Sequence, residues 1–171
     1  MKPGGGRGKG NAFERKVAQT ICKTLGREKS ECYRTPSSGG HRYAKKSDPG
    51  DLVMSADLRR ILPFHIECKH YRKVELWHLL PRTRKRSWVF FRWIQQAIDA
   101  TPSGSGLSPM VVFKGNGKMP ILCAFPYLAN QFPPEGHISV TIDGEYWVVA
   151  VFQEVLKSLT GRIRPVMKGI K

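Results

Sequence analysis

The chain has 171 residues, of which 40% are hydrophobic, and this length suits one domain with a proper hydrophobic core. Lysine and arginine number 29 against 13 acidic residues, which gives a formal net charge of +16. Such an excess indicates a polyanionic partner, either nucleic acid or an anionic membrane surface. No apolar run approaches the roughly 18 residues of a membrane span, and the N-terminus has no apolar signal core, so we expect no secretion.

The cysteines point to a reducing compartment. Their scattered positions show no C-x-x-C spacing, which disfavours both a zinc site and a disulfide framework. We therefore expect reduced, mostly buried thiols in a cytoplasmic protein. The four residues are Cys22, Cys32, Cys68 and Cys123.

The first third of the chain predicts an arm, a helix and a loop. Residues 1–10 are rich in glycine and basic residues, and we expect a flexible basic arm. Residues 11–26 predict a helix with Asn11 as N-cap and Gly26 as its stop. Its apolar stripe comprises Phe13, Val17, Ala18, Ile21, Cys22 and Leu25. Residues 34–50 combine basic residues with turn formers, which is typical of a loop.

The rest of the chain predicts strands and further helices around one sheet. In chain order we expect strands at 51–54 and 62–70 with a polar link around 57–60, a basic patch at 81–88, a helix at 88–100, strands at 110–114 and 120–125, an Asp-Gly hairpin at 137–149, a short helix at 152–159 and a basic tail at 161–171. This order predicts an α/β fold, with a twisted mixed β-sheet flanked by helices in a single domain at 11–160.

Two acids and a lysine suggest hydrolytic chemistry. Asp51 begins one apolar strand and Glu67 lies in the next, so both can meet at one end if the strands are hairpin neighbours. Carboxylates that close repel each other unless a divalent cation such as Mg²⁺ lies between them. Lys69 shares a strand face with Glu67 and could orient an attacking water or stabilise the transition state. The alternative is a surface ion pair between Glu67 and Lys69 that contributes little.

Asp51 followed by Glu67-Cys68-Lys69 resembles the PD-(D/E)XK nuclease superfamily. Upstream, "GNAFERKVA" with Glu14 and the loop "YRTPSSGG" resemble the opening helix and the Arg-x-Pro-x-Ser-Gly loop of archaeal-type Holliday junction resolvases. The loop positions that match are Arg34, Pro36, Ser38 and Gly39. Together these motifs span residues 9–69. Phage-encoded members of this group suit such a compact basic chain.

The resemblance implies a site and an activity. It implies a restriction-endonuclease-like core and a Mg²⁺-dependent endonuclease that resolves four-way DNA junctions as a homodimer, with Mn²⁺ able to substitute. It implies metal ligation by Glu14, Asp51, Glu67 and the backbone carbonyl of Cys68, with Lys69 assisting the nucleophilic water. Arg34 and the catalytic serine, Ser38, would work at the DNA backbone. The expected DNA-binding residues are Arg34, Ser38, Gly39, Arg42, Lys45, Lys46, Arg82, Arg84, Lys85 and Arg86.

Several alternatives remain open at the level of sequence. The family usually places proline directly before the aspartate, whereas Gly50 intervenes here, so Asp48 is a second candidate beside Asp51. Glu14 lies three residues after Asn11 and also fits a capping box. Gln95 and Gln96 fall on the helix expected at 88–100, where some nucleases of the superfamily have a glutamine, but a solvated helix face is the simpler interpretation. Rival functions are a nuclease acting on duplexes, flaps or ends, and a non-catalytic DNA-binding module.

Overall fold

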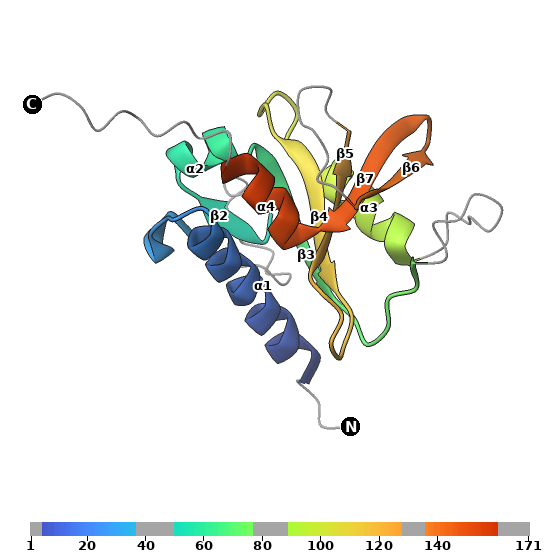
Figure 1. Ribbon diagram of the computed structural model, residues 1–171, viewed down its shortest axis with the longest axis horizontal. Coiled ribbons are helices and arrows are strands. Elements are labelled where there is room, and N and C mark those ends of the chain that lie inside the picture. Colours follow the sequence, from blue (N-terminus) through green and yellow to red (C-terminus); the bar gives the residue numbers. More distant parts are fainter. Residues whose placement is uncertain (1–4, 37–49, 77–88, 128–135, 161–171) are drawn as a thin grey trace, which may run out of the picture.

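The computed structural model describes residues 5–36, 50–76, 89–127 and 136–160 (Figure 1). The helices are α1 (Gly5–Thr24), α2 (Ala56–Ile61), α3 (Val89–Ala100) and α4 (Phe152–Thr160), with a 3-10 turn at Lys29–Glu31. The strands are β1 (Cys32–Arg34), β2 (Leu52–Met54), β3 (Phe64–His70), β4 (Ser108–Lys114), β5 (Leu122–Pro126), β6 (Ile138–Ile142) and β7 (Glu145–Val151). Within these ranges no helix is long and apolar enough to cross a bilayer.

A mixed five-stranded sheet forms the centre of the molecule, in the order β3-β4-β5-β7-β6. Strands β3 and β4 are parallel, and the other neighbours are antiparallel. Strands β1 and β2 form a separate antiparallel pair. The α/β prediction of a mixed sheet flanked by helices is therefore confirmed, and β3 lies at an edge of its sheet.

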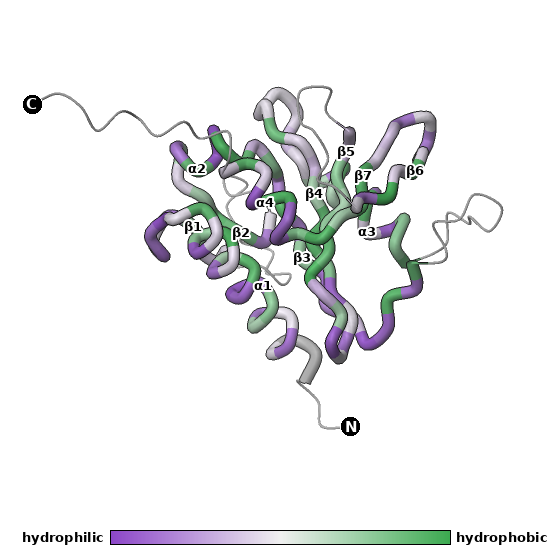
Figure 2. The backbone as a smooth tube through the Cα atoms, in the orientation of Figure 1, coloured by the Kyte–Doolittle hydropathy of each residue, from purple (hydrophilic) through white to green (hydrophobic). Residues whose placement is uncertain are grey.

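The two faces of the sheet bury different helices, because successive strand residues point to opposite sides. Ile66 and Val112 pack with α1, α2 and α4 in one core. Val111 and Phe113 pack with α3 in a second core on the opposite face. Figure 2 shows the hydrophobic residues concentrated along the central strands, with hydrophilic residues on the outer turns. The alternation in β3 places Glu67 and Lys69 on the α3 side.

Helix α1 begins earlier than the sequence indicates. It starts at Gly5, so part of the segment expected as a flexible arm is helical and Asn11 is not its N-cap. Glu14 lies in the third turn of the helix, and the capping-box alternative for this residue is therefore wrong. The glycine-rich first turns have low helix propensity, so their sequence does not predict the extension.

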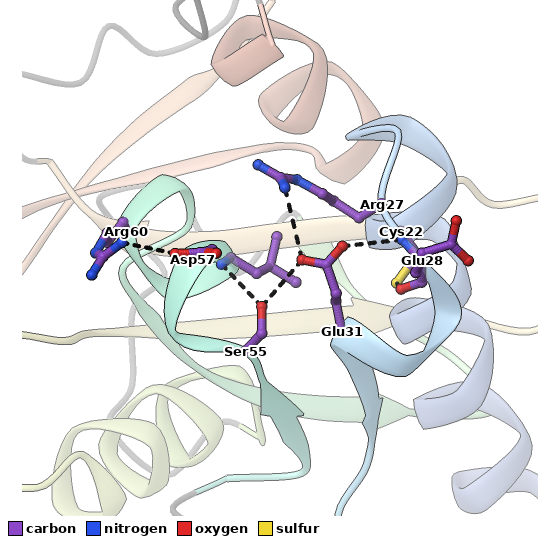
Figure 3. A network of polar contacts seen from close by, with 8 residues as sticks. Cys22, Arg27, Glu28, Glu31, Ser55, Asp57 and Arg60 are labelled. Atoms are coloured by element: carbon purple, nitrogen blue, oxygen red, sulfur yellow. Dashed lines mark hydrogen bonds and ion pairs between the residues drawn. The ribbon is translucent and has the colours of Figure 1, made fainter. Parts of the chain in front are cut away.

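The segment expected as a polar link between strands is helix α2. Ser55 caps it by accepting a hydrogen bond from the backbone N–H of Leu58 at 3.2 Å, and the Leu58 side chain is fully buried. The Ser55 hydroxyl also donates to Glu31 at 3.2 Å, and Glu31 lies 3.8 Å from Arg27 (Figure 3). Because α2 intervenes, β2 pairs with β1, and the assumption that β2 and β3 are hairpin neighbours is wrong.

The later elements follow the sequence pattern closely. The expected hairpin forms between β6 and β7, with φ of 49° at Asp143 and 87° at Gly144. Positive φ at both central residues is the geometry of a type I′ turn, which explains the Asp-Gly pair. Helices α3 and α4 and strands β4 and β5 also occur where their apolar spacing predicts them.

All four thiols are free, and each has a raised pKa. Burial raises the pKa of the Cys22 and Cys123 thiols above their usual value, and it raises the pKa of Cys32 to about 12. Burial and the neighbouring Asp51 carboxylate raise the pKa of Cys68. Because the thiolate is the reactive form, none of these residues is poised for redox chemistry.

We therefore expect the native protein at pH 8 to resist thiol-specific labelling. Fewer than about one of the four thiols should react within the time that labels all four after unfolding in urea, because three of the folded thiols are buried and the raised pKa values keep all four protonated. Mass spectrometry of the alkylated protein measures this. Rapid labelling of a single cysteine in the folded state would contradict the packing described here.

Candidate active site

The candidate site lies along the open edge of β3, where Asp51 bonds to the strand. The backbone N–H of Asp51 donates to the carbonyl of Ile66 at 3.1 Å, and its side-chain Oδ2 accepts from the backbone N–H of Cys68 at 2.7 Å. Asp51 therefore reaches the Glu67 segment although their strands do not pair. The two acids lie close together, as the sequence predicts, but the hydrogen bonds of Asp51 to β3 bring them together rather than a pairing of β2 with β3.

The same bonds orient the backbone carbonyl of Cys68. In an extended strand, the N–H and C=O of one residue point toward the same neighbour. Because the Cys68 N–H points to the Asp51 carboxylate, the Cys68 carbonyl also lies on the open edge of β3. The expected fourth ligand thus lies on the same edge as the aspartate.

Glu67, Lys69 and Gln96 form a closed hydrogen-bond triangle. Lys69 Nζ lies 2.6 Å from Glu67 Oε1 and 3.0 Å from Gln96 Oε1, and Gln96 Nε2 donates to Glu67 Oε1 at 2.7 Å. The side chains of Lys69 and Glu67 are only 15% and 10% exposed. This pair is not the solvated surface pair of the sequence-level alternative, because most of each side chain is removed from water.

Gln96 lies on the exposed face of α3, as the sequence predicts, and from there its amide bonds to both Glu67 and Lys69. Its neighbour Gln95 is exposed as well, but bonds to Asp99 at 2.8 Å. The signal available in the sequence was spacing: Gln96 lies three residues after Trp93 and one before Ala97, both buried against the sheet.

Glu14 joins the site from α1 through Arg34. Arg34 Nε donates to Glu14 Oε2 at 2.6 Å, and the two side chains are 18% and 11% exposed. The pair links the third turn of α1 to the end of β1. The predicted residues Glu14, Arg34, Asp51, Glu67 and Lys69 are thus gathered at one edge of the fold.

The carboxylates are close enough to perturb one another. The pKa of Asp51 is raised from 3.8 to about 7, first by burial and then by the charges of Glu67 and Glu14. The hydrogen bond from the Cys68 N–H and the charge of Lys69 oppose the rise only in part. A carboxyl group with such a pKa indicates a negative site that a cation would relieve.

Gly50 allows Asp51 to approach β3. Its φ is 92°, and a Cβ here would lie 2.7 Å from His65 Cδ2 and Nε2 and 2.9 Å from the Ile66 carbonyl. Thr35 holds the turn by donating its hydroxyl to the Gly50 carbonyl and its N–H to the Asp51 carbonyl, each at 2.9 Å. The glycine before Asp51, a departure from the usual proline, is therefore required by the backbone.

The donor chemistry of the site fits a hard divalent cation. Carboxylate oxygens and a backbone carbonyl are the ligands that Mg²⁺ prefers. As the side chains stand, however, no three His, Cys, Asp or Glu residues in the described ranges are grouped to hold an ion. Glu14 is turned to Arg34, and Glu67 to Lys69 and Gln96. The residues suit the metal, but its binding requires side-chain rearrangement.

Part of the predicted site lies outside the described residues. This part comprises the candidate serine, the alternative aspartate and most of the expected DNA-binding residues. They are Ser38, Gly39, Arg42, Lys45, Lys46, Asp48, Arg82, Arg84, Lys85 and Arg86.

A separate groove of about 800 Å³ lies between α3 and the β6–β7 hairpin. Its lining is mainly apolar and includes Ile98 and Trp147. None of the clustered carboxylates that perturb Asp51 lines it, so it is not the site of hydrolytic chemistry.

The chain was compared with known proteins. A family model described as "Phage putative PDDEXK endonuclease" matches residues 5–161. The match contains all of the described candidate site residues. Searches of curated proteins and of solved structures each found no match.

We expect Gly50→Ala to destabilise the protein by roughly 2–4 kcal/mol, because the new Cβ meets backbone and ring atoms in a left-handed conformation. Gly104→Ala is the matched control, since its φ is 74° and nothing lies within 4 Å of its Cβ position. That variant should lose only about 1 kcal/mol. Urea unfolding measures both, and equal losses would contradict the close approach at Gly50.

Asp51→Asn should stabilise the metal-free protein at high pH. The unfolded chain releases the Asp51 proton near pH 3.8, whereas the folded protein holds it until about pH 7. The stability from this group is therefore complete below about pH 4 and is lost as the pH rises through 7. The amide can still accept from the Cys68 N–H.

In EDTA at pH 8 the variant should exceed wild type by roughly 1–3 kcal/mol in unfolding free energy, with the gap closing toward pH 4. Urea unfolding at both pH values measures it. A variant less stable than wild type at pH 8 would mean that Asp51 is not electrostatically strained.

Proposed function

Because the chain belongs to the phage PD-(D/E)XK endonuclease family, we propose that it is a divalent-metal-dependent DNA endonuclease that resolves four-way junctions. The observation that supports the chemistry is the meeting of Asp51, Glu67 and Lys69 at one strand edge. The net charge of +16 supports a nucleic acid as the substrate. A phage member would act inside the host cell.

In this proposal a divalent ion, Mg²⁺ or a substituting Mn²⁺, is held by Asp51, Glu67, Glu14 and the carbonyl of Cys68. When bound, such an ion lowers the pKa of its water and neutralises charge at the scissile phosphate. The raised pKa of Asp51 agrees with this role, because burial and the charges of Glu67 and Glu14 disfavour an ionised carboxylate that a bound cation would stabilise. The proposed role of the Cys68 carbonyl as a ligand is supported by its position on the open edge of β3, beside Asp51.

Lys69 is the proposed catalytic cation. From its position beside Glu67 it can orient the attacking water and stabilise charge that develops on the phosphate oxygens. Gln96 is a positioning residue in this scheme. Its amide oxygen accepts from Lys69 while its NH₂ group donates to Glu67, so one side chain fixes both partners.

The choice of a four-way junction as substrate rests on the resolvase-like motifs at Glu14, Arg34, Ser38 and Gly39. We propose that Arg34 and Ser38 act at the scissile strand. Gly39, Arg42, Lys45, Lys46, Arg82, Arg84, Lys85 and Arg86 are the other proposed DNA-binding residues.

We also propose that the active form is a homodimer. A junction has nearly two-fold symmetry and requires two cuts, while each chain carries one set of acids. Two chains related by a two-fold axis would present one site to each of the two strands.

Two rival functions differ in substrate or in chemistry. The first is a nuclease of the same superfamily that cuts duplexes, flaps or ends. The second is a DNA-binding module without catalysis. Asp51 is close enough to Glu67 and Lys69 for their charges to shift its pKa, which argues against a decayed site, because a module without chemistry has no need of the repulsion between the two acids.

The test compares cleavage of junction, duplex and flap DNA in Mg²⁺ and in EDTA. We expect Mg²⁺-dependent cleavage of the junction, and we expect Lys69→Ala to lower its rate at least about 100-fold while the protein remains folded. Asp51→Asn should be inactive, whereas Asp48→Asn, its matched control, should stay active. Single-turnover rates and thermal unfolding measure these effects.

The outcomes separate the candidates. Cleavage of duplex or flap in preference to the junction would favour the rival nuclease, and binding without cleavage would favour the DNA-binding module. A cruciform plasmid reports on paired nicks, since these linearise it while single nicks only relax it. Relaxation alone would contradict resolution by a dimer.

A further inference from the structure

The ion pair between Glu14 and Arg34 occupies one of the proposed metal ligands. Its Nε–Oε2 distance is 2.6 Å, and both side chains are mostly buried. A charge-assisted hydrogen bond in such surroundings is stronger than an exposed ion pair. By contrast, the pair between Arg27 and Glu31 is 3.8 Å long and lies nearer the surface.

A divalent cation and the Arg34 guanidinium would compete for the negative charge of Glu14. Like charges repel more strongly where water is partly excluded, so a cation bound at this carboxylate would disfavour the guanidinium beside it. In the structure Arg34 compensates the charge of Glu14 through its hydrogen bond to Oε2.

We propose that Arg34 and the divalent ion compete for Glu14, so that metal binding releases the Arg34 guanidinium from the carboxylate. The proposal rests on the metal role proposed above for Glu14. It makes Arg34 an internal counter-ion of the metal-free site, rather than a permanent clamp on Glu14.

The exchange involves the Arg34 side chain and leaves its backbone in place. Arg34 pairs with Leu52 in the β1–β2 ladder, and the N–H of Thr35 donates to the Asp51 carbonyl. These bonds fix the Cα of Arg34 beside the site. The released guanidinium therefore stays near the scissile phosphate that the metal would bind.

Mn²⁺ binding to the full-length protein without DNA tests the exchange. Free Mn²⁺ is measured by electron paramagnetic resonance, independently of cleavage. Arg34→Gln removes the competing charge and should tighten Mn²⁺ binding about tenfold. Arg34→Lys keeps a positive charge and should bind nearer to wild type. Arg27→Gln, the matched control for loss of an arginine paired to glutamate, should leave the affinity unchanged.

The Glu14→Gln variant separates this proposal from the proposed function. It should weaken Mn²⁺ binding and should abolish the gain from Arg34→Gln in the double variant, because the competition acts through this carboxylate. Wild-type affinity in Glu14→Gln would overturn the metal role of Glu14. A weakened Glu14→Gln together with unchanged or weaker binding by Arg34→Gln would overturn only the exchange, and Arg34 would then be a clamp.

A second measurement uses the wild-type protein and does not depend on the folding of any variant. The Nε–H signal of Arg34 in nitrogen-15 NMR reports on its bond to Glu14. Titration with Mg²⁺ should move this signal and speed the exchange of its proton with water. The midpoint of the signal change should equal the midpoint of Mg²⁺ binding. A signal that stays unchanged at saturating Mg²⁺ would overturn the exchange.

Discussion

The open edge of β3 is the constraint on which the site depends. An edge strand leaves backbone groups without partners, and proteins must cover or satisfy them. Here Asp51 does so with its own N–H and its carboxylate, which bond to Ile66 and Cys68. Asp51 is thereby bonded to the residues on both sides of Glu67. The close approach of the chain at position 50 to β3 requires a residue without a Cβ, so Gly50 is part of the same arrangement.

The site concentrates charge at a cost to the fold. Burial and two neighbouring carboxylates raise the pKa of Asp51 to about 7, which means that the protein disfavours the ionised form that the proposed metal role requires. Arg34 and Lys69 offset part of this repulsion through Glu14 and Glu67. Such strain is common at functional sites, where the arrangement serves a ligand rather than stability.

Helix α3 contributes to both packing and chemistry. Its apolar residues, among them Trp93 and Ala97, are buried against the sheet. Gln96 lies beside this stripe and reaches the Glu67–Lys69 pair. The position of the lysine thus depends on the packing of α3, although the two segments lie 27 residues apart. A substitution that moves α3 would therefore disturb the site without touching an acid.

The sequence by itself determined the elements whose signals are local. The apolar spacing of α3 and α4, the runs of β4 and β5 and the Asp-Gly turn each specify their structure within a few residues, and all occur as predicted. Asp51, Glu67 and Lys69 were also recognisable, because their spacing matches a motif that resembles a nuclease superfamily. The family match over residues 5–161 agrees with that interpretation.

The tertiary structure decided what depends on distant partners. Helix α2 forms because Leu58 fits the core, and the early start of α1 has no local signal. The contact of Gln96 with Lys69 requires α3 to pack on β3, and the pairing of Glu14 with Arg34 requires α1 to pack on β1. A charged or amide side chain looks solvated in sequence, and only the fold shows which groups surround it. For that reason the Glu67–Lys69 pair could be predicted from the sequence, whereas the contacts of Gln96 and Arg34 with the acids could not.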